Sequence, residues 1–317
     1  MLNVGILDSS RVIDGERRVG RYDIARKIEG MDPERDAIAI CHLLAGYEFP
    51  WDITRALEVA LLRTFCVPSI AKLLDHTGEF QHHTQKRYDD TGIIVSELFK
   101  WGYEHPRGQG FLQRMNAIHG RFPITNSDYL YVLSTFIYEP VRWCDRFGWR
   151  PLSKPEKQAM YYFWFAVGER MGITEIPDSY DRFEHYNQTY EQAHFTYAAA
   201  NQRVADATRS MLLGWFPVGL RSLANTAIPA LLDAPLLNAL GWQPAPAPLT
   251  QLLRQSLQMR SRLLRKLPPR TLPDFFADQS IRSYPQGYNL SDIGPTSFKQ
   301  AIGSNKQTYS DAAKKQP

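Results

Sequence analysis

Residues 79–122 read EFQHHTQKRYDDTGIIVSELFKWGYEHPRGQGFLQRMNAIHGRF, and this stretch decides the fold of the 317-residue chain. Two segments in it, about 84–101 and 109–122, have the apolar spacing that is typical of helices. The Gly- and Pro-rich sequence between them predicts a turn. Since residues four apart share one face of a helix, Arg87 and Thr91 are expected to point the same way.

His119 lies within the apolar pattern of the second segment. It follows Met115 by four residues and precedes Phe122 by three, so the pattern places its imidazole on the core side of the helix. A core-facing histidine is most often a neutral side chain hydrogen-bonded to a backbone carbonyl. Periodicity alone therefore does not separate a structural histidine from a cofactor ligand.

Two short motifs within this stretch, KRYDDT at 86–91 and NAIHGRF at 116–122, change that balance. Their order and spacing resemble the latex-clearing-protein and MpaB-like oxygenase family, whose shared unit is also called the rubber oxygenase catalytic domain. Similar stretches follow at 126–143, at 147–173 and toward 265–270, so the resemblance covers roughly residues 40–270.

The resemblance implies an all-α domain that encloses a b-type haem. His119 stands where the family has its axial iron ligand, and Arg87 and Thr91 match an Arg-x-x-x-Thr element beside the haem. Arg114 and Arg121 are weaker candidates for holding the haem propionates. The implied reaction is attack of dioxygen on a carbon–carbon double bond of an isoprenoid or other lipid-like substrate.

One position departs from the family pattern. Latex-clearing members carry a lysine just before the threonine, where this chain has Asp90. We expect Asp90 and Thr91 to be the catalytic side chains, with Asp90 as a distal hydrogen-bonding or proton-transfer group. The glutamate that serves as the base in the latex-clearing enzymes has no clear counterpart here.

Composition is that of an ordinary globular protein, with 44% hydrophobic and 22% charged residues. The net charge of +4 comes without a dense basic stripe, so we expect no nucleic-acid partner. Three scattered cysteines, Cys41, Cys66 and Cys144, are predicted to be buried, reduced thiols. With no apolar run of signal-peptide length at the N-terminus, these features favour a cytoplasmic protein.

We predict one multi-helix globular domain over residues 31–270, preceded by an arm (1–30) and followed by an extended or disordered tail (271–317). Asp32 and Pro33 mark a helix start, and Ser153 with Glu156 forms a capping box at another. Pro140 is expected to kink or end the helix that begins near Asn126. No P-loop, dinucleotide fingerprint or nucleophile elbow is present in the sequence.

Residues 211–240 are apolar but are interrupted by Pro217, Pro229 and Pro235, so they predict short broken helices rather than a membrane span. The alternative for this stretch is a hydrophobic surface that contacts a membrane peripherally or a hydrophobic substrate. The following segment, 250–267, predicts an amphipathic, arginine-rich helix whose charges face solvent.

Two other functions stay open at the level of sequence. Glu79-x-x-His82 and Glu191-x-x-His194 have the spacing of a di-iron carboxylate site in a helical bundle, with Glu97 and Glu169 as further ligands. A non-enzymatic haem-binding protein is the other alternative, because haem ligation alone does not require turnover. Absorbance of haem in the purified protein would separate the di-iron reading from the other two.

Overall fold

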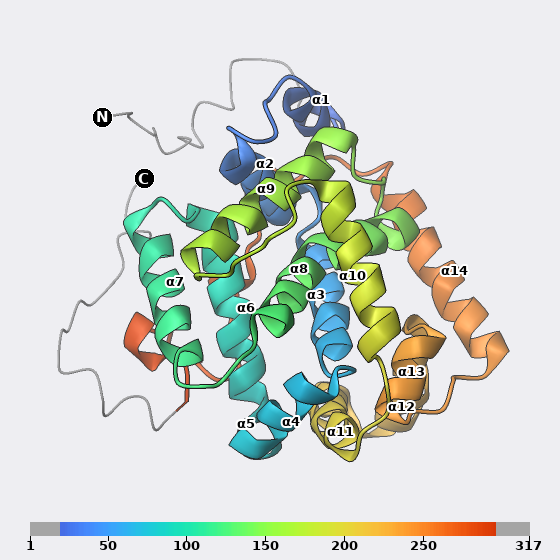
Figure 1. The fold of residues 1–317 in the computed structure, drawn as a ribbon. Coiled ribbons are helices and arrows are strands. Elements are labelled where there is room, and N and C mark those ends of the chain that lie inside the picture. Colours follow the sequence, from blue (N-terminus) through green and yellow to red (C-terminus); the bar gives the residue numbers. More distant parts are fainter. Residues whose placement is uncertain (1–19, 296–317) are drawn as a thin grey trace.

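The computed structural model describes residues 20–295, which form helices joined by short turns, with no β-strand among them (Figure 1). Up to the end of the stretch quoted above, the α-helices are α1 (Asp23–Glu29), α2 (Ala37–Leu43), α3 (Pro50–Thr64), α4 (Pro68–Thr77), α5 (Glu79–His82), α6 (Thr84–Trp101) and α7 (Pro106–His119). They continue with α8 (Asn126–Phe147), α9 (Lys154–Arg170), α10 (Tyr180–His194), α11 (Ala199–Gly214), α12 (Arg221–Ala227), α13 (Ala234–Leu240) and α14 (Ala247–Leu264). Shorter turns of helix are η2 (Leu44–Glu48), η3 (Val218–Leu220), η4 (Ile228–Leu231), η5 (Phe276–Asp278) and η6 (Leu290–Asp292). The all-α prediction is confirmed.

The predicted helical pair is present as α6 and α7, with α6 spanning the predicted residues. Helix α7 begins earlier than predicted, at Pro106, because His105 caps it by accepting a hydrogen bond from the Arg107 amide at 3.2 Å. The two helices approach closely where they meet. A Cβ atom on Gly108 would lie 1.8 Å from the Gly102 carbonyl oxygen, so only glycine fits at this position.

Helix α8 lies at the centre and contacts α3, α9 and α10 (Figure 1). It continues past Pro140 to Phe147, so an early end at this proline is wrong, whereas a kink there stays a prediction. Burial of the helix outweighs the one backbone hydrogen bond that proline removes. The capping box of Ser153 and Glu156 at the start of α9 is confirmed, and the Glu156 carboxylate accepts from the Ser153 amide at 2.7 Å.

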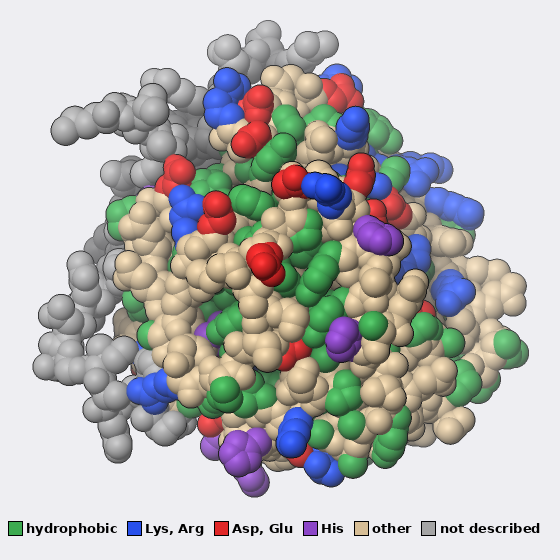
Figure 2. Space-filling view, viewed as in Figure 1, with side chains coloured by type: hydrophobic (Ala, Val, Ile, Leu, Met, Phe, Trp, Pro, Cys, Tyr) green, Lys and Arg blue, Asp and Glu red, His purple; other side chains and the backbone are tan. Residues whose placement is uncertain are grey.

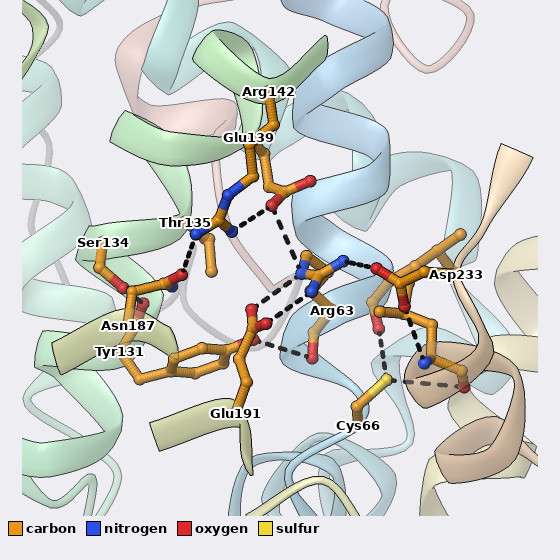
Figure 3. A network of polar contacts seen from close by, with 12 residues as sticks. Arg63, Cys66, Tyr131, Ser134, Thr135, Glu139, Arg142, Asn187, Glu191 and Asp233 are labelled. Atoms are coloured by element: carbon orange, nitrogen blue, oxygen red, sulfur yellow. Dashed lines mark hydrogen bonds and ion pairs between the residues drawn. The ribbon is translucent and has the colours of Figure 1, made fainter. Parts of the chain in front are cut away.

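A buried ion-pair network joins the central helices (Figure 3). The Arg63 guanidinium, on α3, lies 2.5 Å from Glu191 of α10, 2.7 Å from Asp233 before α13, and 3.4 Å from Glu139 of α8. Tyr131 of α8 also donates to Glu191, at 3.1 Å. One guanidinium thus fixes the relative positions of four elements that are distant in sequence.

The segment after residue 270 packs against the helical domain as far as it is described. Phe275, Ile281 and Ile293 are buried in the main hydrophobic core. Residues 271–295 therefore do not form the extended tail that the sequence predicted, and residues 20–30 contain helix α1 rather than only an irregular arm. Residues 1–19 and 296–317 of the predicted arm and tail lie outside the described residues.

Residues 211–240 form the short broken helices that the sequence predicted, namely the end of α11, then η3, α12, η4 and α13. Across residues 20–295, no helix combines the length and the apolar character needed to cross a membrane. The three cysteines are buried and unpaired, as predicted.

Candidate active site

A large apolar cavity of about 300 Å³ lies between α3, α4, α6, α7 and α8. Residues 274–276 and 293–295 also contribute to its wall. Aromatic side chains from two further helices line it, namely Tyr129 and Phe136 of α8 and Trp164 of α9. Phe136 and Trp164 stack with their ring centroids 4.7 Å apart. Such a wall suits a large, flat or chain-like hydrophobic ligand.

His119 is at the C-terminal end of α7 and lines this cavity. Burial, together with the nearby Arg87 guanidinium, lowers the pKa of His119 to about 4, so its imidazole is neutral at physiological pH. The Nδ1 atom is buried and has no hydrogen-bond partner among the described residues. The hydrogen bond to a backbone carbonyl that is usual for a core histidine is therefore not made by Nδ1 within residues 20–295, and the ring has an unused buried nitrogen.

Arg87 and Thr91 lie one turn apart on α6, and both line the cavity. The guanidinium Nη1 of Arg87 donates to the Thr91 hydroxyl at 2.5 Å, and that hydroxyl donates to the Arg87 carbonyl oxygen at 3.0 Å. Burial lowers the pKa of Arg87. Arg87 makes no ion pair with a carboxylate among residues 20–295, although the charges of Asp90 and Glu79 are near enough to oppose the lowering of its pKa.

Asp90 also borders the cavity, but its carboxylate is occupied by other contacts. Oδ2 accepts from Lys86 Nζ at 2.7 Å and from the Gly294 amide at 2.9 Å, and Oδ1 accepts from the Tyr284 hydroxyl. These contacts clasp residues 284–294 onto α6. The catalytic role of Asp90 stays a prediction, whereas the structure shows that Asp90 holds residues 284–294 against α6.

Arg114, the weaker propionate candidate, is also committed to this segment. Its Nε donates to the Ile293 carbonyl oxygen at 2.7 Å, and a second nitrogen donates to Ser291 at 3.2 Å. Neither Arg114 nor Arg121 lines the cavity. Of the arginines named from sequence, the geometry leaves Arg87 as the one that faces the cavity.

Glu58 of α3 is a cavity residue that the sequence did not single out. Its Oε1 accepts from the Tyr88 hydroxyl at 2.7 Å and lies 2.8 Å from the Arg55 guanidinium. Burial raises the pKa of Glu58. The sequence feature that could have identified Glu58 is its position between Leu57 and Leu61, as a carboxylate among apolar residues. Both leucines also line the cavity.

A second, outer pocket of about 270 Å³ adjoins the cavity. The two share the wall residues Pro50, Thr54, Tyr88, Asp274 and Phe276. Trp215 and Tyr88 pack edge to face in this wall, with centroids 5.2 Å apart. The outer pocket also has polar and charged lining residues, among them Arg55 and Arg270, whereas the lining of the cavity is mainly apolar.

The residues on the cavity wall fit a haem group. A neutral imidazole with an unused buried nitrogen is the donor that haem iron takes from a protein. Arg87 offers a cation that makes no direct ion pair with residues 20–295, which suits a propionate. The apolar and aromatic walls suit the macrocycle.

The di-iron alternative gains no support from the structure. Glu191 is held by Arg63, and the His194 Nδ1 lies 2.9 Å from the Tyr190 carbonyl oxygen. In the described part of the chain, no group of three or more His, Cys, Asp and Glu side chains is placed to hold a metal ion. Within residues 20–295 the two Glu-x-x-His sequences therefore do not form a shared metal site.

The fold and the cavity define an all-α protein with an apolar internal cavity, bordered by a neutral histidine and by an arginine that makes no ion pair with residues 20–295. The sequence profile of the family described as "ER-bound oxygenase mpaB/B'/Rubber oxygenase, catalytic domain" matches residues 53–268. The chain belongs to this family of oxygenases, as its motifs had suggested.

Curated relatives carry the same description. The chain is 26% identical, over an alignment 353 positions long, to the ER-bound oxygenase mpaB' of Penicillium brevicompactum. The alignment covers 90% of this chain and 83% of the relative. It is 30% identical over 211 residues to the ER-bound oxygenase mpaB of Penicillium roqueforti (strain FM164), covering 59% of this chain and 71% of that protein.

Proposed function

We propose that this protein is a haem b-dependent oxygenase that acts on a carbon–carbon double bond of an isoprenoid or lipid-like chain. One observation carries the proposal: a neutral His119 faces the same apolar cavity as Arg87, which makes no ion pair with any described residue. Haem b, when bound there, would supply the activation of dioxygen. The membership of the chain in an oxygenase family supports this chemistry.

Three polar residues on the wall have distinct tasks in this proposal. His119 holds the iron through its neutral imidazole, and Arg87 holds a propionate through charge-assisted hydrogen bonds. Thr91 orients Arg87, because its hydroxyl accepts from the guanidinium. The apolar walls exclude water and bind the hydrocarbon chain of the substrate.

The relatives are named as ER-bound enzymes, and we extend a membrane location to this protein as part of the proposal. Isoprenoid and lipid-like chains partition into bilayers, so an enzyme that takes them up gains from working at a membrane surface. The association proposed is peripheral, through the protein surface.

The proposal is tested first by the absorption spectrum and iron content of the purified protein, where a Soret band is expected. His119→Ala should retain its helical circular dichroism but lose haem, whereas His83→Ala, a change at an exposed histidine, should keep it. Arg87→Ala should weaken haem binding roughly 10- to 100-fold, from the 1.5–3 kcal/mol typical of hydrogen bonds to charged groups.

Turnover is tested separately. Aerobic incubation of the haem-loaded protein with an unsaturated isoprenoid should consume oxygen and give oxygenated products, while the saturated analogue should not. Full haem occupancy in His119→Ala would overturn the ligand assignment. A haem protein that consumes no oxygen with any unsaturated chain would favour the non-enzymatic alternative.

A further inference from the structure

Large apolar side chains are exposed mainly on one part of the molecule. Within residues 20–295, twelve such side chains are exposed, and nine of them lie between residues 216 and 272. The nine are Phe216, Val218, Leu220, Leu223, Leu252, Met259, Leu263, Leu267 and Leu272. Val218 and Leu272 are 77% and 73% exposed. Single exposed leucines are ordinary, but a concentration of this kind marks a contact surface.

Helix α14 is apolar on two sides. Leu257 and Leu264 pack against the protein, and Ser261 between them is buried. Leu252, Met259 and Leu263, spaced by seven and four residues, share a different face and are exposed. A helix that merely covers a domain would carry polar residues on that outer face.

The exposed residues of α12 and α14 belong to one surface, since the two helices are in contact and lie together at one side of the molecule (Figure 1). We call the surface formed by residues 216–223 and 252–272 the α12–α14 face. It combines the apolar residues named above with exposed basic ones. Figure 2 shows Lys and Arg side chains along the margin where α14 runs.

The charge of this part of the chain indicates what binds to the α12–α14 face: a second copy of the protein or an anionic membrane. Residues 216–272 contain seven Lys and Arg and one acidic residue, Asp233, whereas the whole chain has a net charge of only +4. Asp233 is paired with Arg63. Arg254, Arg262 and Lys266 are exposed and make no ion pair with any described residue. Such a face repels a second copy of itself and attracts an anionic surface.

We propose that the α12–α14 face docks on a bilayer that contains anionic phospholipids, with its apolar side chains inserted at the level of the headgroups. Broken amphipathic helices with basic and apolar residues intermixed bind in this way. The inference deepens the proposed membrane location and rests on that part of the proposed function, not on the haem assignment. It names the surface and the lipid charge that the family description leaves open.

The α12–α14 face lies next to the outer pocket, so docking on a membrane would bring that pocket close to the lipids. Trp215, which precedes Phe216, and Arg270, which precedes Leu272 by two residues, both line the outer pocket. That pocket shares a wall with the apolar cavity. A bilayer at the α12–α14 face would therefore lie close to the outer pocket, whose wall is shared with the apolar cavity.

The test is co-sedimentation of the full chain with vesicles of phosphatidylcholine alone or mixed with phosphatidylserine. Binding should be at least tenfold stronger to the anionic vesicles. Arg254→Glu/Arg262→Glu should bind them at least 30-fold more weakly, from about fivefold for each basic residue near such a surface. Val218→Ser/Leu223→Ser should also weaken binding several-fold, with no change in charge.

The control is Arg26→Glu/Lys27→Glu, which makes the same charge change on exposed residues of α1, at the far end of the molecule from α12 (Figure 1). It should bind like the wild type. Equal binding to both vesicles, or full binding by the Arg254/Arg262 variant, would overturn the proposal. So would a wild-type dimer that Val218→Ser/Leu223→Ser turns into a monomer, because the face would then be an interface between copies. Loss of haem or of turnover leaves vesicle binding unaffected, so the two proposals fail separately.

Discussion

Arg87 and Thr91 are linked twice across one turn of α6. The guanidinium donates to the threonine hydroxyl at 2.5 Å, and the same hydroxyl donates to the Arg87 carbonyl oxygen at 3.0 Å. The single hydroxyl hydrogen of Thr91 is thus used within the helix, and the hydroxyl oxygen holds the guanidinium against the cavity wall. These contacts give Thr91 a role in positioning Arg87, whereas its catalytic role stays a prediction.

Thr91→Val should loosen Arg87 and weaken haem binding. Removal of one hydrogen bond changes the free energy by about 0.5–1.5 kcal/mol, so we expect a roughly two- to tenfold loss of affinity in a haem titration. Thr91→Ser keeps the hydroxyl and should bind haem like the wild type. If Thr91→Val in an Arg87→Ala background caused a further loss of the same size, Thr91 would act independently of Arg87.

Asp90→Ala should detach the segment that contains Tyr284 and Gly294. It removes the acceptor of Lys86 and of the Gly294 amide in a largely buried setting. We expect a loss of about 3 kcal/mol in the free energy of unfolding, as for other broken buried ion pairs, and faster proteolysis within residues 271–295. Urea denaturation and timed digestion measure the two effects.

The matched control for Asp90 is Asp278→Ala, which breaks the more exposed pair between Asp278 and Lys100 in the same segment. Exposed pairs contribute less than about 1 kcal/mol, so this variant should unfold nearly like the wild type. Equal effects of the two substitutions would mean that Asp90 does not clasp the segment. Retained stability with lost oxygenation in Asp90→Ala would instead favour the catalytic role expected from the sequence.

Arg63→Met should destabilise the protein strongly, because three carboxylates would lose their common cation (Figure 3). Loss of one partner from a buried network costs about 3–5 kcal/mol. Arg203→Met, which breaks a more exposed pair with Asp75, is the control and should cost less than about 1 kcal/mol. Thermal or urea unfolding of both variants provides the comparison, and similar losses would contradict the central role of Arg63.

The helical fold could be predicted from sequence because local signals control it. Apolar spacing gave the bounds of α6, and the Ser153–Glu156 capping box gave the start of α9. Local signals failed where packing outweighs them. At Pro140 the helix continues because its surroundings bury it, a fact that the sequence of α8 does not contain.

The segment 271–295 could not be placed from sequence because single long-range contacts hold it. The Phe275 ring packs where Gly46 lacks a side chain, at a point where a Cβ atom would lie 2.6 Å from the ring. Arg114 reaches its backbone at Ile293. Neither contact has a local pattern, and the composition of the segment resembles that of a loop.

The candidate site divides in the same way. The motifs singled out His119, Arg87 and Thr91, and the structure brings all three to one cavity. The structure also shows two features that the motifs could not predict. Asp90 is occupied by contacts to Lys86 and Gly294, and Glu58 of α3 lines the same cavity. A carboxylate in an apolar stripe gains meaning only when the partners that bury it are known.

Glu58 gives a prediction about pH. Burial raises its pKa in the folded protein above the ordinary value of 4.5, despite the nearby Arg55 and the hydrogen bond from Tyr88. The folded state therefore keeps this proton at pH values where the unfolded chain has lost it. By linkage, the contribution of Glu58 to stability is greatest below the unfolded pKa and falls as pH rises through the folded pKa.

Glu58→Gln removes this titration while an amide oxygen can still accept from Tyr88. The free energy of unfolding of the variant, relative to the wild type, should therefore rise from about pH 4.5 upward and level off once Glu58 is charged in the folded state. Urea denaturation at half-unit pH steps measures the difference, and Glu104→Gln, at an exposed position, controls for the change in net charge. A difference that is flat with pH, or that falls as pH rises, would show that Arg55 and Tyr88 outweigh burial and keep Glu58 charged on the cavity wall.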